Sequence, residues 1–512
     1  MIRIEPRDGV YRITFPYNPA IVETVKKIPG RKWDKETKAW LVPQCLTTRS
    51  FIKHLLPGII MPDVHPPRMV HDHEYQPPLK SYKHQEMITK TLMRAVQDGK
   101  SIALFAETGT GKTKAILDLI THFPQRRALV VCPRPLMGVW EYEASRWCCA
   151  KPTKVHGNKR VDPRYMSGDG MFALTSYGTF VNDIEKWRES RPYDIVVFDE
   201  AHLLKNKSSQ RSKACRSFDA ATKIPMTGTP YGNEYKDLWA IMDSADPAAF
   251  GPWGVFAGAY CVYGGWEDKE IIGYQNLDLM MNIVRHTSIV VRKDQCLDLP
   301  PKQYQTINVD MGDAQRKAYR RCEAGGVGDM PISSVLTMIG KLRQISSGFV
   351  YGEDGEVLEF WPSEKIQALS EMCWDTPTVI WHNFTEEGNM IASLMCDLGV
   401  TYTRAMGDGF AYQAARDFES GKIQVIIAQM QTLQYGVTMN RATRSIYFSG
   451  TFSSQDRAQS EDRNHRIGQS NSVLYIDFIA SPIEQWIFEA CSTKSDVREH
   501  ILKKLSEMQN NA

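Results

Sequence analysis

The sequence predicts an α/β protein of two tandem lobes, each a parallel sheet covered by helices, preceded by a small α+β module. Short apolar runs alternate with longer amphipathic segments through most of the 512 residues. Such a rhythm is typical of buried parallel strands that are linked by helices. Because it occurs on both sides of the Leu299-Pro300-Pro301 run, we expect two sheets rather than one.

Eight apolar runs are the expected strands. In the first lobe they are residues 102–105, 128–131, 172–174 and 195–198. In the second lobe they are residues 378–381, 424–428, 444–448 and 473–478. We place the first lobe at residues 79–298 and the second at residues 299–512, with a helical tail from Pro482.

The N-terminal part differs in composition from the two lobes. Residues 1–60 are expected to form a small unit of alternating strands and one helix. Residues 61–78 are expected to be a linker, because five prolines fall within them and such segments are stiff and extended. His71 and His73 in this linker lack the further ligands that a metal site needs.

Composition excludes several classes of protein. The net charge is +3, with 42% apolar and 24% charged residues, which is ordinary for a soluble globular protein. Any nucleic-acid surface must therefore be a local patch. No apolar run approaches the ~20 residues that span a bilayer, and the charged segment Met1–Val10 does not resemble a signal peptide. We therefore expect no membrane partner. Eleven cysteines without C-x2-C spacing indicate reduced thiols, so we expect a cytoplasmic location.

The run after the first expected strand is a phosphate-binding loop, Ala106-Glu107-Thr108-Gly109-Thr110-Gly111-Lys112-Thr113. Its glycines allow a tight turn that points backbone N–H groups at phosphate oxygens, and a helix is expected to follow over residues 113–120. Lys112 is expected to reach the β- and γ-phosphates, and the Thr113 hydroxyl to ligate magnesium. Ala106 replaces the usual first glycine. A glycine-rich turn without function is disfavoured by the strand before and the helix after it, so ATP and Mg²⁺ are the predicted cofactors.

Asp199 and Glu200 follow the expected strand 195–198. Carboxylates there lie at the carboxyl edge of the sheet, where open α/β folds bind ligands. Asp199 is expected to hold magnesium and Glu200 to polarise the attacking water. An exposed acidic turn is the other interpretation, and the presence of the loop and the acidic pair in this order within one sheet argues against it.

A third run in the second lobe supplies two arginines. It reads Gln459-Ser460-Glu461-Asp462-Arg463-Asn464-His465-Arg466-Ile467-Gly468-Gln469. Arg463 and Arg466 are three residues apart and are expected to share one face of a helix. Their guanidinium groups would stabilise charge on the transferring phosphoryl group. Taken alone, this segment is equally typical of a solvated helix of mixed charge.

Together these runs resemble the Snf2 branch of the superfamily 2 helicase-like ATPases. The likeness extends from about Leu79 to Cys491. The matching runs are, in chain order, Leu79–Gln85, Val131–Arg134 with Trp140 downstream, Ser176–Tyr177, Asp199–Asn206, Thr227–Pro230, Thr378–Phe384, Gln434–Thr438 and Gln459–Gln469. The extended acidic run and the last run favour Snf2-type proteins over DEAD-box RNA helicases.

The resemblance implies the roles of further residues. It implies two RecA-like lobes that close on ATP, with Gln85 reading adenine. It also implies movement along double-stranded DNA without strand separation. The expected DNA contacts are Arg134, Ser176, Tyr177 and Thr438.

Residues 28–40 resemble the HARP-type module of annealing helicases. Arg31, Lys32 and other basic residues interleave there with Trp33 and Trp40. The pattern predicts a surface that stacks bases and contacts phosphates of branched or single-stranded DNA. The two tryptophans are also typical of the core of a small β-rich domain, and both interpretations stay open.

The sequence therefore predicts a DNA-dependent ATPase that acts on duplex, forked or branched DNA in replication, recombination or repair. Single-stranded DNA and a single-strand-binding protein are further partners, and a monomer is expected. The compact chain resembles a phage or bacterial member, which places it in the cytoplasm of a bacterium or an infected host, or in the nucleus of a eukaryote. The alternatives are a strand-separating superfamily 2 DNA helicase, an RNA remodeller and a non-enzymatic DNA-binding scaffold. Intact Lys112, Asp199 and Glu200 argue against the scaffold.

Overall fold

A computed structural model describes the chain as two compact units, unit 1 (Met1–Cys296) and unit 2 (Leu297–Ala512). The described residues are 2–59, 61, 81–147, 152–157, 162, 172–230, 234–265, 270–327, 330, 331, 335–352, 354–360, 363–405, 407–430 and 438–493. The expected linker beyond Met61, including His71 and His73, and the run Gln434–Val437 lie outside these ranges. No helix inside them has both the length and the apolar character needed to span a membrane.

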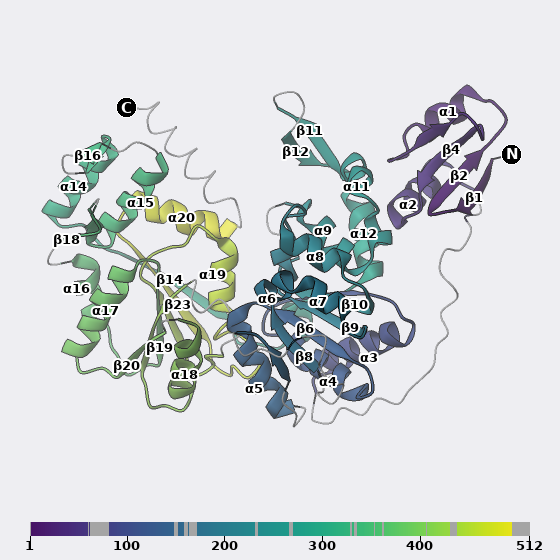
Figure 1. Ribbon diagram of the computed structural model, residues 1–512. Helices are drawn as coiled ribbons and strands as arrows, with labels where there is room; N and C mark the ends of the chain where they lie inside the picture. The colour runs from purple at the N-terminus through teal and green to yellow at the C-terminus, as the bar shows by residue number, and fades with distance from the viewer. Residues whose placement is uncertain are drawn as a thin grey trace. The chain divides into compact units, whose positions relative to one another are not determined.

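Unit 1 contains a seven-stranded sheet, here called the sheet of lobe 1, whose strands are all parallel (Figure 1). The strand order is β13-β5-β10-β9-β6-β8-β7. The strands are β5 (Ala103–Ala106), β6 (Ala128–Cys132), β7 (Thr153–Val155), β8 (Phe172–Ser176), β9 (Tyr193–Asp199), β10 (Ala220–Thr227) and β13 (Ser288–Val291). Since β5, β10 and β9 are neighbours, the loops after their carboxyl ends meet at one edge of the sheet.

Helices cover both faces of this sheet (Figure 1). The described helices of unit 1 after the N-terminal module are α3 (Lys83–Gln97), α4 (Lys112–His122), α5 (Met137–Trp147), α6 (Tyr177–Asn182), α7 (Ile184–Glu189), α8 (Gln210–Ser217), α9 (Asp237–Ala245), α10 (Pro247–Phe250), α11 (Trp253–Tyr260), α12 (Leu277–Thr287) and α13 (Lys293–Cys296). A separate antiparallel hairpin is formed by β11 (Cys261–Gly264) and β12 (Glu270–Tyr274).

The N-terminal module is a four-stranded antiparallel sheet with two helices. Its strand order is β1-β2-β4-β3. Its elements are β1 (Arg3–Arg7), β2 (Val10–Thr14), α1 (Pro19–Val25), β3 (Lys32–Asp34), β4 (Ala39–Pro43) and α2 (Leu46–Leu55). The prediction of one helix was therefore wrong. Helix α2 starts at an unusual N-cap, Cys45, whose side chain and backbone exchange contacts with Thr48, so the sequence lacks the usual serine or aspartate start signal.

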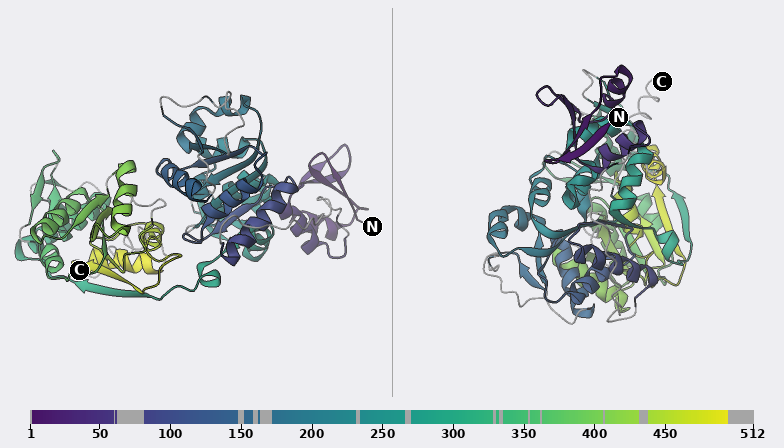
Figure 2. Two further views of the ribbon diagram at one scale, coloured as in Figure 1. Left: turned by 90° about the horizontal axis from the view of Figure 1, so that it is seen from below. Right: turned by 90° about the vertical axis from the view of Figure 1, so that its right-hand side faces the viewer.

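Helix α2 attaches this module to lobe 1. It packs against α10, α11 and α12, and Leu46 and Phe51 join the hydrophobic core of the lobe. The Cys45 thiol donates to the Phe250 carbonyl at 3.7 Å, and the Tyr260 hydroxyl is 3.3 Å from Thr47 Oγ1. The views of Figure 2 show the purple module beside the rest of unit 1. The module is thus a docked part of unit 1.

Unit 2, or lobe 2, contains a six-stranded parallel sheet with helices on both faces (Figure 1). The strand order is β14-β23-β22-β19-β21-β20. The strands are β14 (Lys302–Asn308), β19 (Thr378–His382), β20 (Tyr402–Ala405), β21 (Val425–Gln429), β22 (Arg444–Tyr447) and β23 (Val473–Ile479). The two parallel sheets confirm the predicted α/β class, and all eight expected strands are present.

The helices of unit 2 are α14 (Asp313–Glu323), α15 (Val335–Ser346), α16 (Glu364–Ser370), α17 (Thr385–Asp397), α18 (Gly407–Glu419), α19 (Ser454–Glu461) and α20 (Pro482–Thr493). Two small hairpins pair β15 (Gly326–Val327) with β16 (Met330–Pro331) and β17 (Phe349–Tyr351) with β18 (Val357–Glu359).

Candidate active site

The phosphate-binding loop is a turn held by its own side chains. Gly109 and Gly111 have φ angles of 85° and 86°, which glycine adopts without a steric penalty. The buried Thr110 hydroxyl donates to the Glu107 carbonyl at 2.7 Å. Lys112 is 9% exposed, and its ammonium group donates to the Ala106 carbonyl at 2.7 Å. The lysine thus closes the loop upon itself, while Thr113 lies partly exposed in the first turn of α4.

Gln85 and Glu107 support this loop from outside. The Gln85 amide donates to the Thr110 carbonyl at 3.3 Å and accepts from the backbone N–H of Tyr82 at 3.1 Å. A Cβ atom on Gly111 would overlap the Gln85 amide, so only glycine fits there. The Glu107 carboxylate accepts from the Lys293 backbone N–H at 2.9 Å. In this structure the side chains of Gln85 and Glu107 hold the loop, and the reading of adenine by Gln85 stays a prediction.

Asp199 lies at the end of β9 and is 4% exposed. Its Oδ2 accepts from the Trp140 indole N–H at 2.8 Å, and its Oδ1 accepts from the Glu200 backbone N–H at 2.9 Å. Burial, followed by repulsion from Glu200, raises the pKa of Asp199 to about 7, although Trp140 and Lys112 act in the opposite direction. A buried carboxylate of this kind is stabilised by an added cation.

Glu200 is held in a strained conformation beside His202. Its φ of 51° lies in the left-handed region, which costs a non-glycine residue on the order of 1 kcal/mol or more. It precedes the 3-10 turn η3 (Ala201–Leu204). His202 Nδ1 is 3.2 Å from Glu200 Oε2 and 3.2 Å from Thr227 Oγ1. The imidazole therefore links the predicted water-polarising residue to the end of β10.

The loop after β10 touches the phosphate-binding loop directly. A Cβ atom on Gly228 would lie 2.9 Å from Thr108 Oγ1 and 3.1 Å from the Thr108 backbone nitrogen. Such contacts are tighter than side chains normally allow, so glycine permits the two loops to pack. The predicted ATP-binding residues and the predicted catalytic carboxylates are thus brought together at one edge of the lobe 1 sheet.

The predicted arginine helix of lobe 2 is corrected by the structure. Helix α19 ends at Glu461, with Asp462 as its C-cap, and both Arg463 and Arg466 lie in the turns that follow. Arg463 is 3% exposed and Arg466 is partly exposed. The three-residue spacing was read as a helical face, but the helix has already stopped. The two arginines are therefore positioned by loop contacts.

Two hydrogen-bonded anchors hold these turns. The Arg463 carbonyl accepts from the Met439 backbone N–H at 2.9 Å, next to the partly exposed Thr438. The buried Gln469 amide donates to the carbonyls of Asn440 and Asn464 at 2.8 and 2.9 Å. The arginine-bearing loop is thus fixed to the segment that begins at Thr438.

A buried ionic cluster fixes the helix before the arginines. Arg457 pairs with Glu461 at 2.8 Å and with Asp477 at 2.6 Å, and its guanidinium group lies 3.6 Å from the ring centroid of Tyr447. Lys302 reaches the other oxygen of Glu461 at 2.8 Å. Burial opposes ionisation of Glu461, but Arg457 and Lys302 outweigh it, so its pKa lies below its ordinary value. The end of α19 is therefore tied to β14 and β23.

Comparison with known proteins identifies the family. A profile of the SNF2-related domain matches residues 84–348. This range is more than half of the chain. The chain belongs to the SNF2-related family.

Its relatives are larger proteins. The chain is 25% identical over 443 residues to an uncharacterized ATP-dependent helicase of Mycoplasma genitalium, covering 81% of this chain and 41% of that protein. It is 24% identical over 439 residues to an ISWI chromatin-remodeling complex ATPase of Arabidopsis thaliana, covering 79% and 41%. The chain thus spans about two fifths of the length of these curated relatives. A solved SWI2/SNF2 ATPase core of Sulfolobus solfataricus in complex with double-stranded DNA has a TM-score of 0.42 and 20% identity, over 82% of this chain and 92% of that one.

Two aromatic residues of lobe 1 make contacts with Asp199 that the sequence did not predict. The Trp140 indole holds Asp199, as described above. The Tyr177 hydroxyl donates to the Asp199 carbonyl at 2.8 Å, and its side chain is 3% exposed. In the sequence both residues resemble ordinary core aromatics, and nothing in their local pattern indicates a contact with Asp199.

The predicted DNA contacts fall into two groups. Arg134, at the start of η1 (Arg134–Leu136), is exposed, as are Arg31 and Lys32 of the N-terminal module. Ser176 is 4% exposed and caps α6 by accepting from the Thr179 backbone N–H at 3.3 Å. Ser176 and Tyr177 are therefore buried supports of α6 and of the end of β9 in this structure, and their contact with DNA stays a prediction.

The magnesium ligands fit the chemistry of that ion. Asp199 and Thr113 offer a carboxylate and a hydroxyl, which are hard oxygen donors of the type that Mg²⁺ prefers. Each Asp199 oxygen accepts one of the hydrogen bonds described above and keeps a further lone pair. Across the described ranges there is no group of three or more histidine, cysteine or acidic side chains arranged to hold a metal ion, so the ligand set would be completed by substrate and water.

Proposed function

We propose that this chain is an ATP-driven motor of the Snf2 type that moves along double-stranded or forked DNA. The observation that carries the proposal is the meeting of Lys112, which follows β5, with Asp199 and Glu200, which follow β9, at one edge of a parallel sheet in which only β10 separates the two strands. This arrangement suits hydrolysis of a nucleoside triphosphate, because phosphoryl transfer depends mainly on positioning and on charge stabilisation.

ATP binding would change the contacts of the closed loop. Lys112 leaves the Ala106 carbonyl and donates to phosphate oxygens, while the loop N–H groups from Gly109 to Thr113 face the phosphates. Asp199 and Thr113 would hold Mg²⁺, which when bound neutralises charge on the β- and γ-phosphates. Glu200 orients the attacking water. We assign Arg463 and Arg466 to charge stabilisation when the lobes close, as the family resemblance implies.

The SNF2-related family supports DNA as the partner, and the relative with a solved structure is described with double-stranded DNA. In our proposal, exposed cations on lobe 1 contact the phosphate backbone, with Arg134 among them. Such contacts carry little sequence information and depend strongly on salt.

We further propose that the N-terminal module acts like a HARP-type module and directs the motor to forks. Trp33 is 48% exposed and packs on Trp40 with ring centroids 5.3 Å apart. Trp40 packs on the module core, so one tryptophan is internal and the other is available to a base. Arg31 and Lys32 lie exposed beside it. This arrangement supports fork remodelling or strand annealing as the activity.

The test of the motor is steady-state ATP hydrolysis without nucleic acid and with single-stranded DNA, duplex DNA, forked DNA or RNA. Strong stimulation by duplex or forked DNA that Lys112→Ala abolishes is the expected result. Stimulation by single strands alone would favour a strand-separating helicase, stimulation by RNA alone would favour an RNA remodeller, and no hydrolysis would leave the scaffold.

The test of the module uses Trp33→Ala in the full chain. Loss of one stacking contact is expected to weaken binding to forked DNA by about tenfold, since stacking contributes about 1–3 kcal/mol per base, while plain duplex still stimulates hydrolysis. Tyr17→Ala is the control, because Tyr17 is an exposed aromatic residue of the same module that lies outside the Trp33–Trp40 pair. Equal affinity of wild type and Trp33→Ala for forks would exclude the stacking role.

A further inference from the structure

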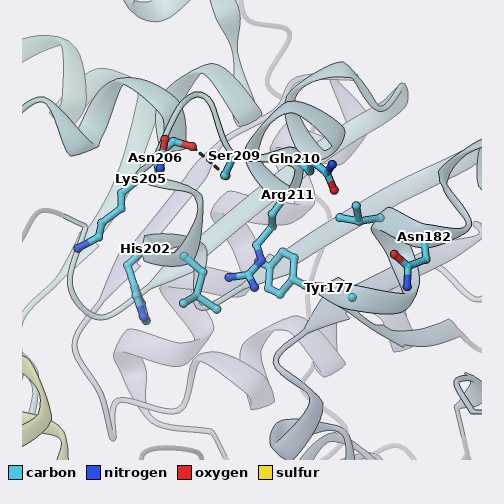
Figure 3. A pocket seen from close by; sticks show the side chains of 11 residues that line it. Tyr177, Asn182, His202, Lys205, Asn206, Ser209, Gln210 and Arg211 are labelled. Carbon is cyan, nitrogen blue, oxygen red and sulfur yellow. Dashed lines mark hydrogen bonds between the residues drawn. The ribbon is translucent and has the colours of Figure 1, made fainter.

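A cavity of about 700 Å³ lies in lobe 1 beside the catalytic carboxylates. Its walls come from α6, from η3 with the loop after it, and from the start of α8 (Figure 3). The polar side chains that bear on the argument are Tyr177, His202, Lys205, Asn206 and Arg211. Lys205 and Asn206 belong to the extended acidic run Asp199–Asn206, and the resemblance assigns neither of them a role.

The charge of the lining favours an anion. The residues around the cavity include two cations, Lys205 and Arg211, and no aspartate or glutamate. Lys205 is exposed. The side-chain oxygen of Asn206 already accepts from the Ser208 backbone N–H at 3.1 Å. The side-chain amide hydrogens of Asn206 therefore stay oriented as donors. Charge-assisted hydrogen bonds from arginine, lysine and amide groups are the usual means of binding phosphate.

Two residues of the cavity wall also contact the catalytic pair: Tyr177 through the backbone carbonyl of Asp199, and His202 through the carboxylate of Glu200. The Arg211 guanidinium group lies 5.3 Å from the ring centroid of Tyr177, whose hydroxyl donates to the Asp199 carbonyl. His202, on the other side of Figure 3, contacts Glu200 Oε2. One side chain therefore connects the cavity to Asp199 and another connects it to Glu200.

We propose that this cavity is an effector site for a phosphate group of a DNA strand, and that its occupancy acts on Asp199 and Glu200 through Tyr177 and His202. A phosphate bound here would attract the Arg211 guanidinium group, which lies over the Tyr177 ring. A shift of Arg211 would therefore change the packing of Tyr177, whose hydroxyl bonds the Asp199 backbone carbonyl. The inference rests on the proposed function and extends it, because it names the contact through which DNA stimulates hydrolysis. Inorganic phosphate shares the same chemistry, and the experiment separates the two sources.

The binding half is tested by the salt dependence of duplex DNA affinity, measured by fluorescence anisotropy. Lys205→Ala and Arg211→Ala are each expected to lower the slope of log affinity against log salt by about 1, as loss of one phosphate contact requires. Lys213→Ala is the matched control, because Lys213 is an exposed lysine of the same helix that does not line the cavity. Unchanged slopes in both cavity variants would overturn the DNA contact.

The coupling half is tested by Tyr177→Phe, which removes only the hydroxyl. We expect the duplex concentration for half-maximal stimulation to stay within about twofold of wild type, while the stimulated kcat falls about tenfold, in the range seen when an outer support of a metal ligand is lost. Tyr319→Phe is the control, since it removes a buried tyrosine hydroxyl in unit 2.

A second readout does not depend on turnover. Affinity for a fluorescent ATP analogue with Mg²⁺ is measured with and without duplex DNA. DNA is expected to change this affinity in wild type and in Tyr319→Phe but not in Tyr177→Phe. Full stimulation of Tyr177→Phe by DNA would overturn the coupling and leave the motor intact.

Further outcomes separate the proposals. If no nucleic acid stimulates the wild type, the proposed function fails. If inorganic phosphate stimulates the wild type as strongly as duplex does, and Arg211→Ala removes this effect, the site binds free phosphate and the DNA assignment is overturned.

Discussion

Two buried carboxylates in the two units are held in opposite ways. Asp199 in unit 1 accepts hydrogen bonds from neutral donors and lies beside Glu200, so burial raises its pKa to about 7. Glu461 in unit 2 is surrounded by Arg457 and Lys302, and its pKa lies below the ordinary value although burial opposes ionisation. Glu461 is thus neutralised by cations of the fold itself, whereas the hydrogen-bond donors that hold Asp199 are neutral.

The two groups have opposite effects on stability. Glu461 stabilises unit 2 above its ordinary pKa of 4.5, and this contribution is lost as the pH falls through the depressed value. The pKa of Asp199 is raised from its ordinary value of 3.8 to about 7 in the folded state, so folding favours the protonated form. Unit 1 therefore loses stability as the pH rises between these two pKa values. A carboxylate with resident cations thus supports the fold, whereas Asp199 costs stability until a cation is supplied.

The largest expected effect is on the framework side of this comparison. Arg457→Met leaves Glu461 and Asp477 in the interior with much less compensation, so we expect unit 2 to lose about 3–5 kcal/mol of unfolding free energy. Urea unfolding measures the loss. Arg416→Met, which changes an exposed arginine of α18, is expected to stay within about 0.5 kcal/mol of wild type. A loss of similar size in both variants would contradict the framework role.

The next effect is on the catalytic side. Lys112→Ala removes the ammonium group that is proposed to stabilise charge on the phosphates. We therefore expect kcat for ATP hydrolysis to fall on the order of 10²–10³-fold. Phosphate release is the measurement. Lys90→Ala, an exposed lysine of α3, is the control and is expected to match wild type. Activity within tenfold of wild type would remove Lys112 from the site.

A third prediction tests the pH dependence of Asp199 directly. The stability of Asp199→Asn relative to wild type is expected to rise by roughly 1–4 kcal/mol between pH 4 and pH 8 in magnesium-free buffer, because only the wild type must ionise a buried carboxylate. Asparagine also turns an N–H toward a donor, which adds a cost that does not vary with pH. Thermal unfolding across this range gives the difference, and a flat profile would show that Asp199 is not strained by its burial.

The smallest expected effect concerns the support of Asp199. Trp140→Phe removes the indole N–H, and we expect the half-saturating Mg²⁺ concentration for hydrolysis to rise about tenfold. Trp187→Phe is the control, since Trp187 is equally buried in lobe 1 but does not contact a carboxylate of the site. The two variants behaving alike would mean that the indole bond to Asp199 does not matter.

Much of the fold and the centre of the site were predictable because they depend on local signals. A buried parallel strand is a short apolar run, as at Ala128–Cys132, and a glycine-rich loop before a helix has one main physical use. Asp199 and Glu200 were predictable because they follow such a strand. In each case the residue's neighbours in sequence are also its neighbours in space.

The missed features depend on contacts between distant segments. Trp140 and Asp199 are 59 residues apart, and nothing in an amphipathic helix marks one tryptophan as a donor to a carboxylate. Arg463 and Arg466 showed helical spacing, but their loop is fixed by Gln469 and by the segment after Thr438. The bond of the Gln85 amide to the Thr110 carbonyl was also not predictable, because it joins segments 25 residues apart.

The docking of the N-terminal module has a mechanical consequence. Because Cys45 and Thr47 of the module contact α10 and α11, we expect the module and lobe 1 to move together as one rigid body. A strand gripped at Trp33 would therefore keep a constant distance from the phosphate-binding loop through every cycle. If the module binds a fork as proposed, this docking would fix the distance between the fork junction and the phosphate-binding loop.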